Sequence, residues 1–506
     1  MSATAVDVRL RLQFLLWYGV MGLGVLLLGM FMASDQFFAA FIVAGVGWLA
    51  LLPYHAQLSL HLALATFGSA FIVPFLAGRP YMWEMAALLA WTGVPIVIFL
   101  RRYPADFGRL LREHKWVFVG AALYCAVLVM TMLVRGVGLN ILGSSKVGGR
   151  LYFQQIICAI FPLLFLSLRL EERTVVRLMV VQWILSATYL LSDAAFTLGG
   201  ALTGVLYLLE IANDAMNFEL SAMRFGVRRF QSFAIFGTSM ILLLLAFNNL
   251  RDFLGRRALW LLPLTAVLAA IGVASGHRVV VLTLAGTGFV VALAQRFFTI
   301  GHLFRLTLIG VAALVTVYST VDMMPQAAQR AVSFLPGLRV DAQSKVDAEL
   351  TWGLRRTLFR VGLGMIPDYF WVGRGFHKYL SELPPYHPQQ QTLMFHLDQG
   401  VFYNGFIGLM VNTGVFGTVG MLIFLYGGTR VAVRIVLHLR RHGCEDTFAR
   451  ISSVAAGVWI TGVVLFVFLH GDAETAMKTF SLQAGLLLVC DKLLRQRQEA
   501  AMVAAA

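Results

Sequence analysis

The chain has 506 residues, of which 59% are hydrophobic and 13% are charged, and its mean hydropathy is +0.79. The apolar share of a water-soluble globular protein lies near about one half, so this composition excludes that class and predicts an integral membrane protein. The formal net charge is +15. Such an excess favours anionic partners.

Fourteen apolar stretches approach the roughly 20 residues that a helix needs to cross a bilayer. They predict an all-α, polytopic protein. The stretches are 13–33, 36–53, 57–77, 82–100, 116–134, 151–169, 175–196, 231–249, 258–275, 279–295, 306–321, 405–427, 452–470 and 478–491. The last is short, and only a few residues separate the second from the third. The predicted number of spans is therefore 12 to 14.

Basic residues recur in every second loop, which is typical of loops on the cytoplasmic side. These loops are 101–115, 169–177, 251–257, 296–305, 430–450 and the tail 492–498. The pattern predicts that both termini are cytoplasmic. Further basic residues gather in the opposite loops, either as solvated surface charge or as an anion-binding face.

One segment, 322–404, is too long for a simple connection and predicts a large external loop with structure of its own. Within it, 350–366 has a helical apolar period with interleaved arginines, which predicts an amphipathic helix at the membrane interface. Pro367 and the glycines after it predict a turn and a flexible loop. The chain then divides into 1–230 and 231–321 (spans with external loops), 322–404 (the large loop) and 405–506 (C-terminal spans).

Four motifs occur in a fixed order along the chain. They are "RRFQSFAIFGTS" at the start of a span, "SGHR" between two spans, "LFRVGLGMIPDYFWVGRG" in the long loop, and the closing "YNGFIGLMVNTGVFG". This ordered set, over roughly 224–427, resembles the O-antigen ligase and O-antigen polymerase superfamily. The N-terminal half is similar only as a row of spans.

The resemblance implies a membrane glycosyltransferase of O-antigen, lipopolysaccharide or exopolysaccharide biosynthesis. Members move a glycan from a polyprenyl-pyrophosphate carrier such as undecaprenyl pyrophosphate to an acceptor hydroxyl on a glycan, a lipid core or a protein. They act at the periplasmic face of the bacterial inner membrane, with no metal, cofactor or nucleic acid. Arginines suit the departing pyrophosphate, because their planar fork binds phosphate oxygens bidentately.

Arg278 matches the arginine of the superfamily's Ser-Gly-Ser-Arg motif and is implied to be catalytic, although His277 replaces the second serine. Arg229, or Arg228 beside it, matches an arginine that opens an earlier span. The alternative for each is an interfacial arginine that reaches to lipid headgroups. Further arginines in the long loop are expected to contact headgroups or glycan, namely Arg355, Arg356, Arg360 and Arg374.

The superfamily's His-Asn pair is replaced here by Tyr403 and Asn404. A tyrosine with an ordinary pKa near about 10 is a poor base, so the base is expected elsewhere. His396 is the first candidate, Asp398 and His387 are further options, and positioning by arginines alone is another. Asn404 keeps its match and is expected to orient an oxygen.

A second class of function fits the same number of spans, namely a transporter or glycolipid flippase. Under that hypothesis Glu84, within a span, is a proton-relay candidate. The simpler interpretation is a hydrogen bond between helices. The enzyme is favoured because the unusual charges lie in external loops rather than at mid-membrane.

Overall fold

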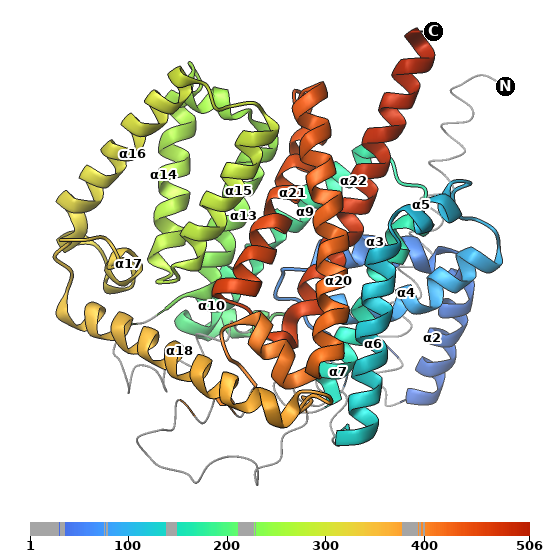
Figure 1. Ribbon diagram of the computed structural model, residues 1–506. Coiled ribbons are helices and arrows are strands. Elements are labelled where there is room, and N and C mark those ends of the chain that lie inside the picture. Colours follow the sequence, from blue (N-terminus) through green and yellow to red (C-terminus); the bar gives the residue numbers. More distant parts are fainter. Residues whose placement is uncertain are drawn as a thin grey trace.

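The structure is a computed structural model that describes Met30 and residues 36–74, 76, 79–137, 149–210, 227, 229–376, 393, 396, 397 and 400–505. Within these residues it is all-α, with two isolated backbone bridges and no strand, which confirms the predicted class. The helices stand mostly side by side in one bundle, and α18 (Ala342–Tyr369) crosses beneath it (Figure 1).

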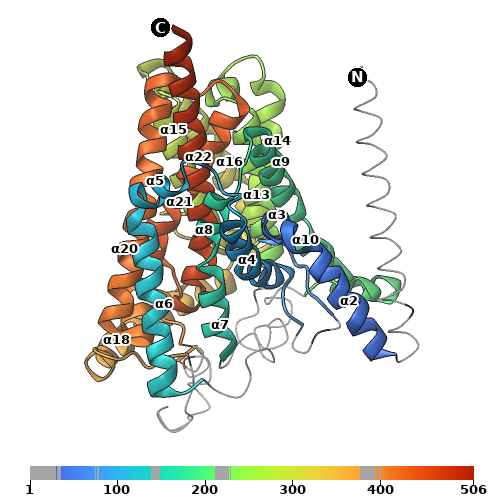
Figure 2. The same ribbon diagram turned by 90° about the vertical axis from the view of Figure 1, so that its right-hand side faces the viewer.

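The described helices of the N-terminal half begin with α2, which lies at the edge of the bundle (Figure 2). Its helices are α2 (Phe37–Leu51), η1 (Leu52–Tyr54), α3 (His55–Thr66), α4 (Met82–Phe99), α5 (Phe107–Glu113), α6 (Lys115–Arg135), α7 (Gly149–Cys158), α8 (Phe161–Ser167), α9 (Glu172–Leu185), α10 (Thr188–Leu198) and η2 (Gly200–Tyr207).

Among the described residues, the C-terminal half contains the longest helices. Its helices are α13 (Gln231–Phe247), η3 (Leu250–Leu254), α14 (Ala258–Ala274), α15 (Val279–Ala294), α16 (Ile300–Thr320), η4 (Val321–Met323), α17 (Gln326–Val332), α18 (Ala342–Tyr369), α20 (Gly405–His442), α21 (Thr447–Val464), the π-helical turn η7 (Leu465–Leu469), η8 (Ala473–Thr475) and α22 (Ala476–Ala505).

Seven helical segments of the described chain are long and apolar enough to cross a membrane, and three shorter apolar helices accompany them. The seven are Met82–Phe99, Lys115–Arg135, Gly149–Ser167, Glu172–Leu198, Ile300–Met323, Gly405–His442 and Thr447–Leu469. Apolar side chains on α16 face outward, with Phe304 67% and Val315 61% exposed, as expected for a surface that meets lipid. The described chain is therefore all-helical, and seven of its helical segments have the length and composition of membrane spans.

Two details differ from the sequence predictions. The stretch 57–77 is not one span, because α3 ends at Thr66 and the chain then turns into backbone pairing, with Phe71 opposite Leu209. The predicted turn at Pro367 is also wrong. The helix α18 passes through it and ends at Tyr369, so the missing proline N–H costs only one hydrogen bond in its last turns. The predicted first span, 13–33, lies almost wholly outside the described residues.

Two apolar clusters organise the bundle. The larger one joins most of the helices between α3 and α22. The smaller one packs Leu358 of α18 against Phe402, Ile407 and Val411 at the start of α20, with Leu397 beside them. Fully burying one such side chain away from water is worth about 1.5–3 kcal/mol. This second cluster fixes α18 against the beginning of α20, and the polar residues described below lie along that junction.

Candidate functional site

The turn between α14 and α15 carries the Ser-Gly-His-Arg sequence and lies beside the start of α13. Phe230 donates its backbone N–H to the carbonyl of Ser275 at 3.1 Å. Gly276 has a φ of +78°, which L side chains rarely adopt, and a Cβ there would lie 3.5 Å from Cγ of Arg229. The left-handed φ therefore favours glycine at this turn, whereas the approach of Arg229 is an ordinary van der Waals contact.

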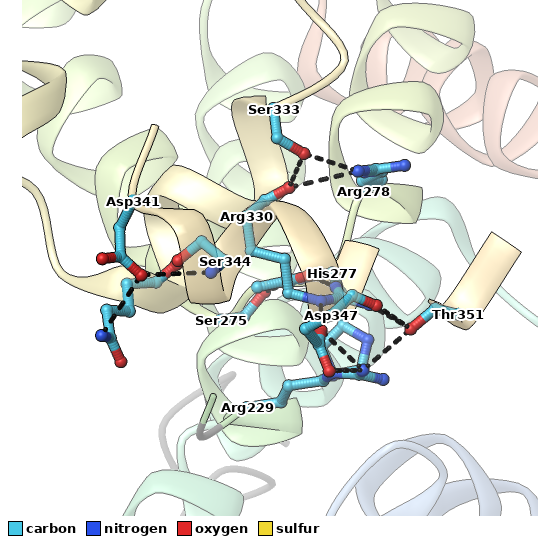
Figure 3. Close-up of polar contacts among 12 residues, drawn as sticks. Arg229, Ser275, His277, Arg278, Arg330, Ser333, Asp341, Ser344, Asp347 and Thr351 are labelled. Carbon is cyan, nitrogen blue, oxygen red and sulfur yellow. Dashed lines mark hydrogen bonds and ion pairs between the residues drawn. The ribbon is translucent and has the colours of Figure 1, made fainter. Parts of the chain in front are cut away.

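Asp347 on α18 is shared by two arginines (Figure 3). Arg229 donates from Nη2 to both carboxylate oxygens at 3.0 and 3.2 Å, and Arg330 of α17 donates from Nε. Both arginines also donate to Oγ1 of Thr351, at 3.1 and 3.0 Å. Arg330 further binds the carbonyl of Gly276 at 2.5 Å. One carboxylate thus holds two guanidinium groups against the α14–α15 turn.

Arg278 lies next to this group and is bound differently. Its Nη2 donates to Oγ of Ser333 at 2.7 Å and reaches the carbonyl of Arg330 at 3.4 Å (Figure 3). Its Nε is buried and has no hydrogen-bond partner in the described part of the chain, where no carboxylate forms an ion pair with it. Arg278 is therefore a half-buried cation that only neutral oxygens bind.

One face of α18 points to these residues. Asp347, Thr351 and Arg355 are spaced by four residues and so lie along one side of the helix. Arg356 and Arg360 lie on other sides and are exposed. The structure thus brings Arg355 to the site, whereas the expected role of Arg356 and Arg360 as substrate contacts stays a prediction.

Tyr403 lies at the centre of a second polar group, just before α20. The guanidinium of Arg355 lies 4.9 Å from the centre of its ring. The ring stacks on His470 at 5.6 Å between centroids and meets the edge of His396 at 5.2 Å. Tyr403 itself has a φ of +51°, which is uncommon for a residue other than glycine and costs about 1–3 kcal/mol.

Asp472 completes this group from the loop between η7 and η8. Its carboxylate accepts a hydrogen bond from the backbone N–H of Tyr403. The positive charge of Arg355 also acts on this carboxylate and lowers its pKa, against the larger effect of burial, which raises it. The atom Oδ1 is buried without a hydrogen-bond partner among the described residues, and so are Nδ1 of His470 and Nε of Arg355. Buried polar atoms are normally paired, so these three suit a polar ligand. We call the whole assembly the arginine–tyrosine site: Arg229, Arg278, Arg330, Asp347, Thr351, Arg355, His396, Tyr403, His470 and Asp472.

Positive charge dominates the arginine–tyrosine site. Burial lowers the pKa of Arg330 to about 10, with a further contribution from Arg229. Burial likewise lowers the pKa of Arg278 and of Arg355, and in both cases the charge of Arg229 adds to the effect. Cations held close together with too few carboxylates favour an anion, because an anion relieves their mutual repulsion.

The histidines and the carboxylate of the site titrate in opposite directions. Burial lowers the pKa of His396 and of His470 to about 4 each, and the charge of Arg355 adds to both shifts. Burial raises the pKa of Asp472 to about 6, against the opposing hydrogen bond from Tyr403. At neutral pH the two imidazoles are therefore neutral, and Asp472 is the group closest to its titration point.

Other predicted residues lie elsewhere. Arg374 is buried and donates from Nη1 to the carbonyl of Leu397 at 3.0 Å, so it braces the chain before α20. Asn404 is the N-cap of α20, and its Oδ1 accepts the N–H of Ile407 at 3.0 Å, which accounts for it structurally. Arg228, Asp398 and His387 lie outside the described residues.

The sequence interpretation missed Arg330, Asp347, His470 and Asp472. The sequence "LHGDAE" (469–474) carries a signal, since a histidine and an aspartate flank a glycine directly after a span. Asp347 lies one turn before Thr351 and two before Arg355, but only the position of α18 shows that this side faces the arginines. Arg330 belongs to no motif of the resemblance.

The local geometry therefore describes a buried, cation-rich site with unsatisfied polar atoms, built from segments far apart in the sequence. Arg229 and Asp472, which lie at its two ends in the chain, are brought together by α18 and by the start of α20. The function has to be argued from this geometry and from the resemblance in sequence, because no known family model matches the chain and no curated protein is a significant relative.

Proposed function

We propose that the protein is a membrane glycosyltransferase that moves a glycan from a polyprenyl-pyrophosphate carrier to an acceptor hydroxyl at the periplasmic face of the bacterial inner membrane. One observation carries this proposal. Arg278 and Arg355 are half-buried cations for which the described residues supply no ion-pair partner, beside a group of buried polar atoms that lack hydrogen-bond partners among the described residues.

The reaction needs little beyond charge and position. The acceptor oxygen attacks the anomeric carbon of the donor, and a new C–O bond forms there. The bond between that carbon and the carrier pyrophosphate breaks, and its electron pair leaves with the pyrophosphate. The hydroxyl proton passes to a base. Fixed cations stabilise the charge that develops on the leaving group, and removing one such group typically costs about 10²–10³-fold in rate.

The arginines divide this work. Asp347 neutralises part of the charge of Arg229 and Arg330 and fixes their positions. Within the described arginine–tyrosine site, Arg278 and Arg355 each retain a buried Nε without a hydrogen-bond partner, and we assign these two arginines to the phosphate oxygens. Arginine suits the role because it stays charged in spite of its lowered pKa.

A transporter, the alternative from the sequence, draws less support. Its proton-relay candidate, Glu84, is buried in an ion pair with Arg150 at 2.8 Å and accepts a hydrogen bond from Gln154 at 2.8 Å. A carboxylate that is paired in this way stabilises helix packing and is poorly placed to exchange protons.

The test uses the glycans of a host strain that lacks the protein. We expect accumulation of lipid-linked glycan: single repeat units for a polymerase, or full chains for a ligase. Complementation with Arg278→Ala should leave this accumulation in place, whereas the exposed control Arg339→Ala should restore the wild-type product. Unchanged glycans in the deletion strain, or full rescue by inserted Arg278→Ala, would contradict the proposal.

A further inference from the structure

We propose that Asp472 is the catalytic base that removes the proton from the acceptor hydroxyl. The inference rests on the glycosyltransferase function proposed above and specifies the one group that the resemblance does not supply. It replaces His396, the base expected from the sequence, with a carboxylate from the loop that joins η7 to η8.

The side chain of Asp472 does not cap the helix that it precedes. Asp472 is the N-cap residue of η8, and an aspartate there usually accepts N–H groups of its own helix. It makes no such side-chain cap and turns instead to the backbone N–H of Tyr403. One carboxylate oxygen is thereby anchored, while Oδ1 is buried and lacks a partner among the described residues. An anchored carboxylate with one unused oxygen is prepared for a hydroxyl.

The loop is held in place by close packing. A Cβ on Gly471 would lie 2.6 Å from the carbonyl oxygen of Phe466, and a Cβ on Gly405 would lie 2.6 Å from the same oxygen. Only glycine fits at these two positions, so the loop and the start of α20 meet at the turn of η7. This contact holds the loop of Asp472 next to the segment of Tyr403, whose backbone N–H the carboxylate accepts.

The neighbouring groups favour the carboxylate over the imidazoles. Three elements contribute them: Arg355 comes from α18, His396 and Tyr403 from the chain before α20, and His470 from the same loop. Arg229 and Arg278 act on Arg355 from further away, and His277 acts on His470. With a pKa of about 6 against about 4, Asp472 binds a proton more strongly than either histidine and is ionised at neutral pH.

The proton balance is simple. Ionised Asp472 takes the acceptor's proton on Oδ1 while the acceptor oxygen bonds to the anomeric carbon and the pyrophosphate departs with the electrons of the broken bond. The carboxylic acid then releases its proton to water. Arg355 remains charged throughout and keeps Asp472 ionised before the reaction.

The experiment measures two quantities, one on the purified full-length protein and one on membrane vesicles from the host, either inverted or right-side-out. The first is the affinity for inorganic pyrophosphate, and the second is the rate at which endogenous lipid-linked glycan is consumed. Asp472→Asn should bind pyrophosphate within about twofold of wild type and transfer glycan about 10²–10⁴-fold more slowly. Asp368→Asn, an exposed aspartate on α18, is the matched control and should behave as wild type.

Two further readouts separate a base from a structural residue. The wild-type rate should fall as the pH drops through about 6, and this dependence should persist in His396→Ala. Added formate should partly restore transfer in Asp472→Gly, since a small carboxylate can replace the missing one. Transfer by Asp472→Asn within threefold of wild type, in a protein that binds pyrophosphate, would overturn this inference alone. Wild-type protein that neither binds pyrophosphate nor consumes lipid-linked glycan would overturn it together with the proposed function.

Discussion

Two groups of charged residues in this protein differ in how completely their polar atoms are hydrogen-bonded. Around Glu84, at the start of α4, every oxygen of the carboxylate is used: Arg150 donates at 3.1 and 2.8 Å, Gln154 at 2.8 Å and the N–H of Tyr81 at 2.5 Å. In the arginine–tyrosine site the cations outnumber the carboxylates, and several polar atoms have no partner among the described residues. We call the first the Glu84 group.

The difference separates structure from function. A buried charge is tolerated when its partners compensate for lost hydration, and the Glu84 group meets that condition. The arginine–tyrosine site does not meet it, because some of its hydrogen-bonding atoms have no partner among the described residues. Substitutions should therefore affect the Glu84 group through stability and the arginine–tyrosine site through activity.

The largest effect is expected for Glu84→Ala. It leaves Arg150 buried and without its carboxylate, which typically costs about 3–5 kcal/mol. Thermal unfolding of the purified protein in detergent should show a clear loss, and Glu113→Ala, in an exposed pair with Arg495, should show almost none. Equal unfolding temperatures for both variants would remove the contrast between the two regions.

Arg355→Ala should instead reduce activity and leave stability almost unchanged. In the proposed mechanism the guanidinium stabilises the departing pyrophosphate, so its loss should slow glycan transfer by about 10²–10³-fold. No carboxylate forms a salt bridge with Arg355 in the described part of the chain, so its unfolding temperature should stay close to wild type. Glycan consumption in vesicles measures the first quantity and thermal unfolding the second. A variant that is unstable yet fully active would reverse the interpretation.

Gly276→Ala tests the turn that carries Arg278. A left-handed alanine costs roughly 1–2 kcal/mol, whereas its Cβ would make only an ordinary van der Waals contact with Arg229, at 3.5 Å. We expect a moderate loss of stability together with a loss of transfer, because the turn positions two arginines of the site. Alanine at Gly288, which has open space around it in α15, is the control. Full activity in Gly276→Ala would show that the turn geometry is dispensable.

Arg356→Ala should have the smallest effect. It is adjacent to Arg355 in sequence but exposed on another side of α18, and such surface substitutions usually change stability by less than about 0.5 kcal/mol. Transfer rate and unfolding temperature should both match wild type. A large loss of transfer would place substrate on the outer side of α18 and would support the sequence expectation for Arg356.

Sequence reasoning was most successful where long-range contacts matter least. Apolar length alone predicts helices such as Lys115–Arg135 and Thr447–Leu469, because hydrocarbon requires it. Arg278 was found through its motif. The base proposed here, Asp472, was not, because its role depends on a contact with Tyr403 across 69 residues of chain. Likewise, periodicity predicts a helix at 350–366 but does not say which of its arginines faces inward.

Pyrophosphate binding tests the central claim most directly. Isothermal titration of the purified protein with inorganic pyrophosphate should show saturable binding that Arg278→Ala weakens at least tenfold. Glu84→Gln, which alters the other charge group but keeps its shape, should leave the affinity unchanged. Equal affinities for wild type and Arg278→Ala would contradict an anion site at the arginine–tyrosine site, as would the absence of any binding by the wild-type protein.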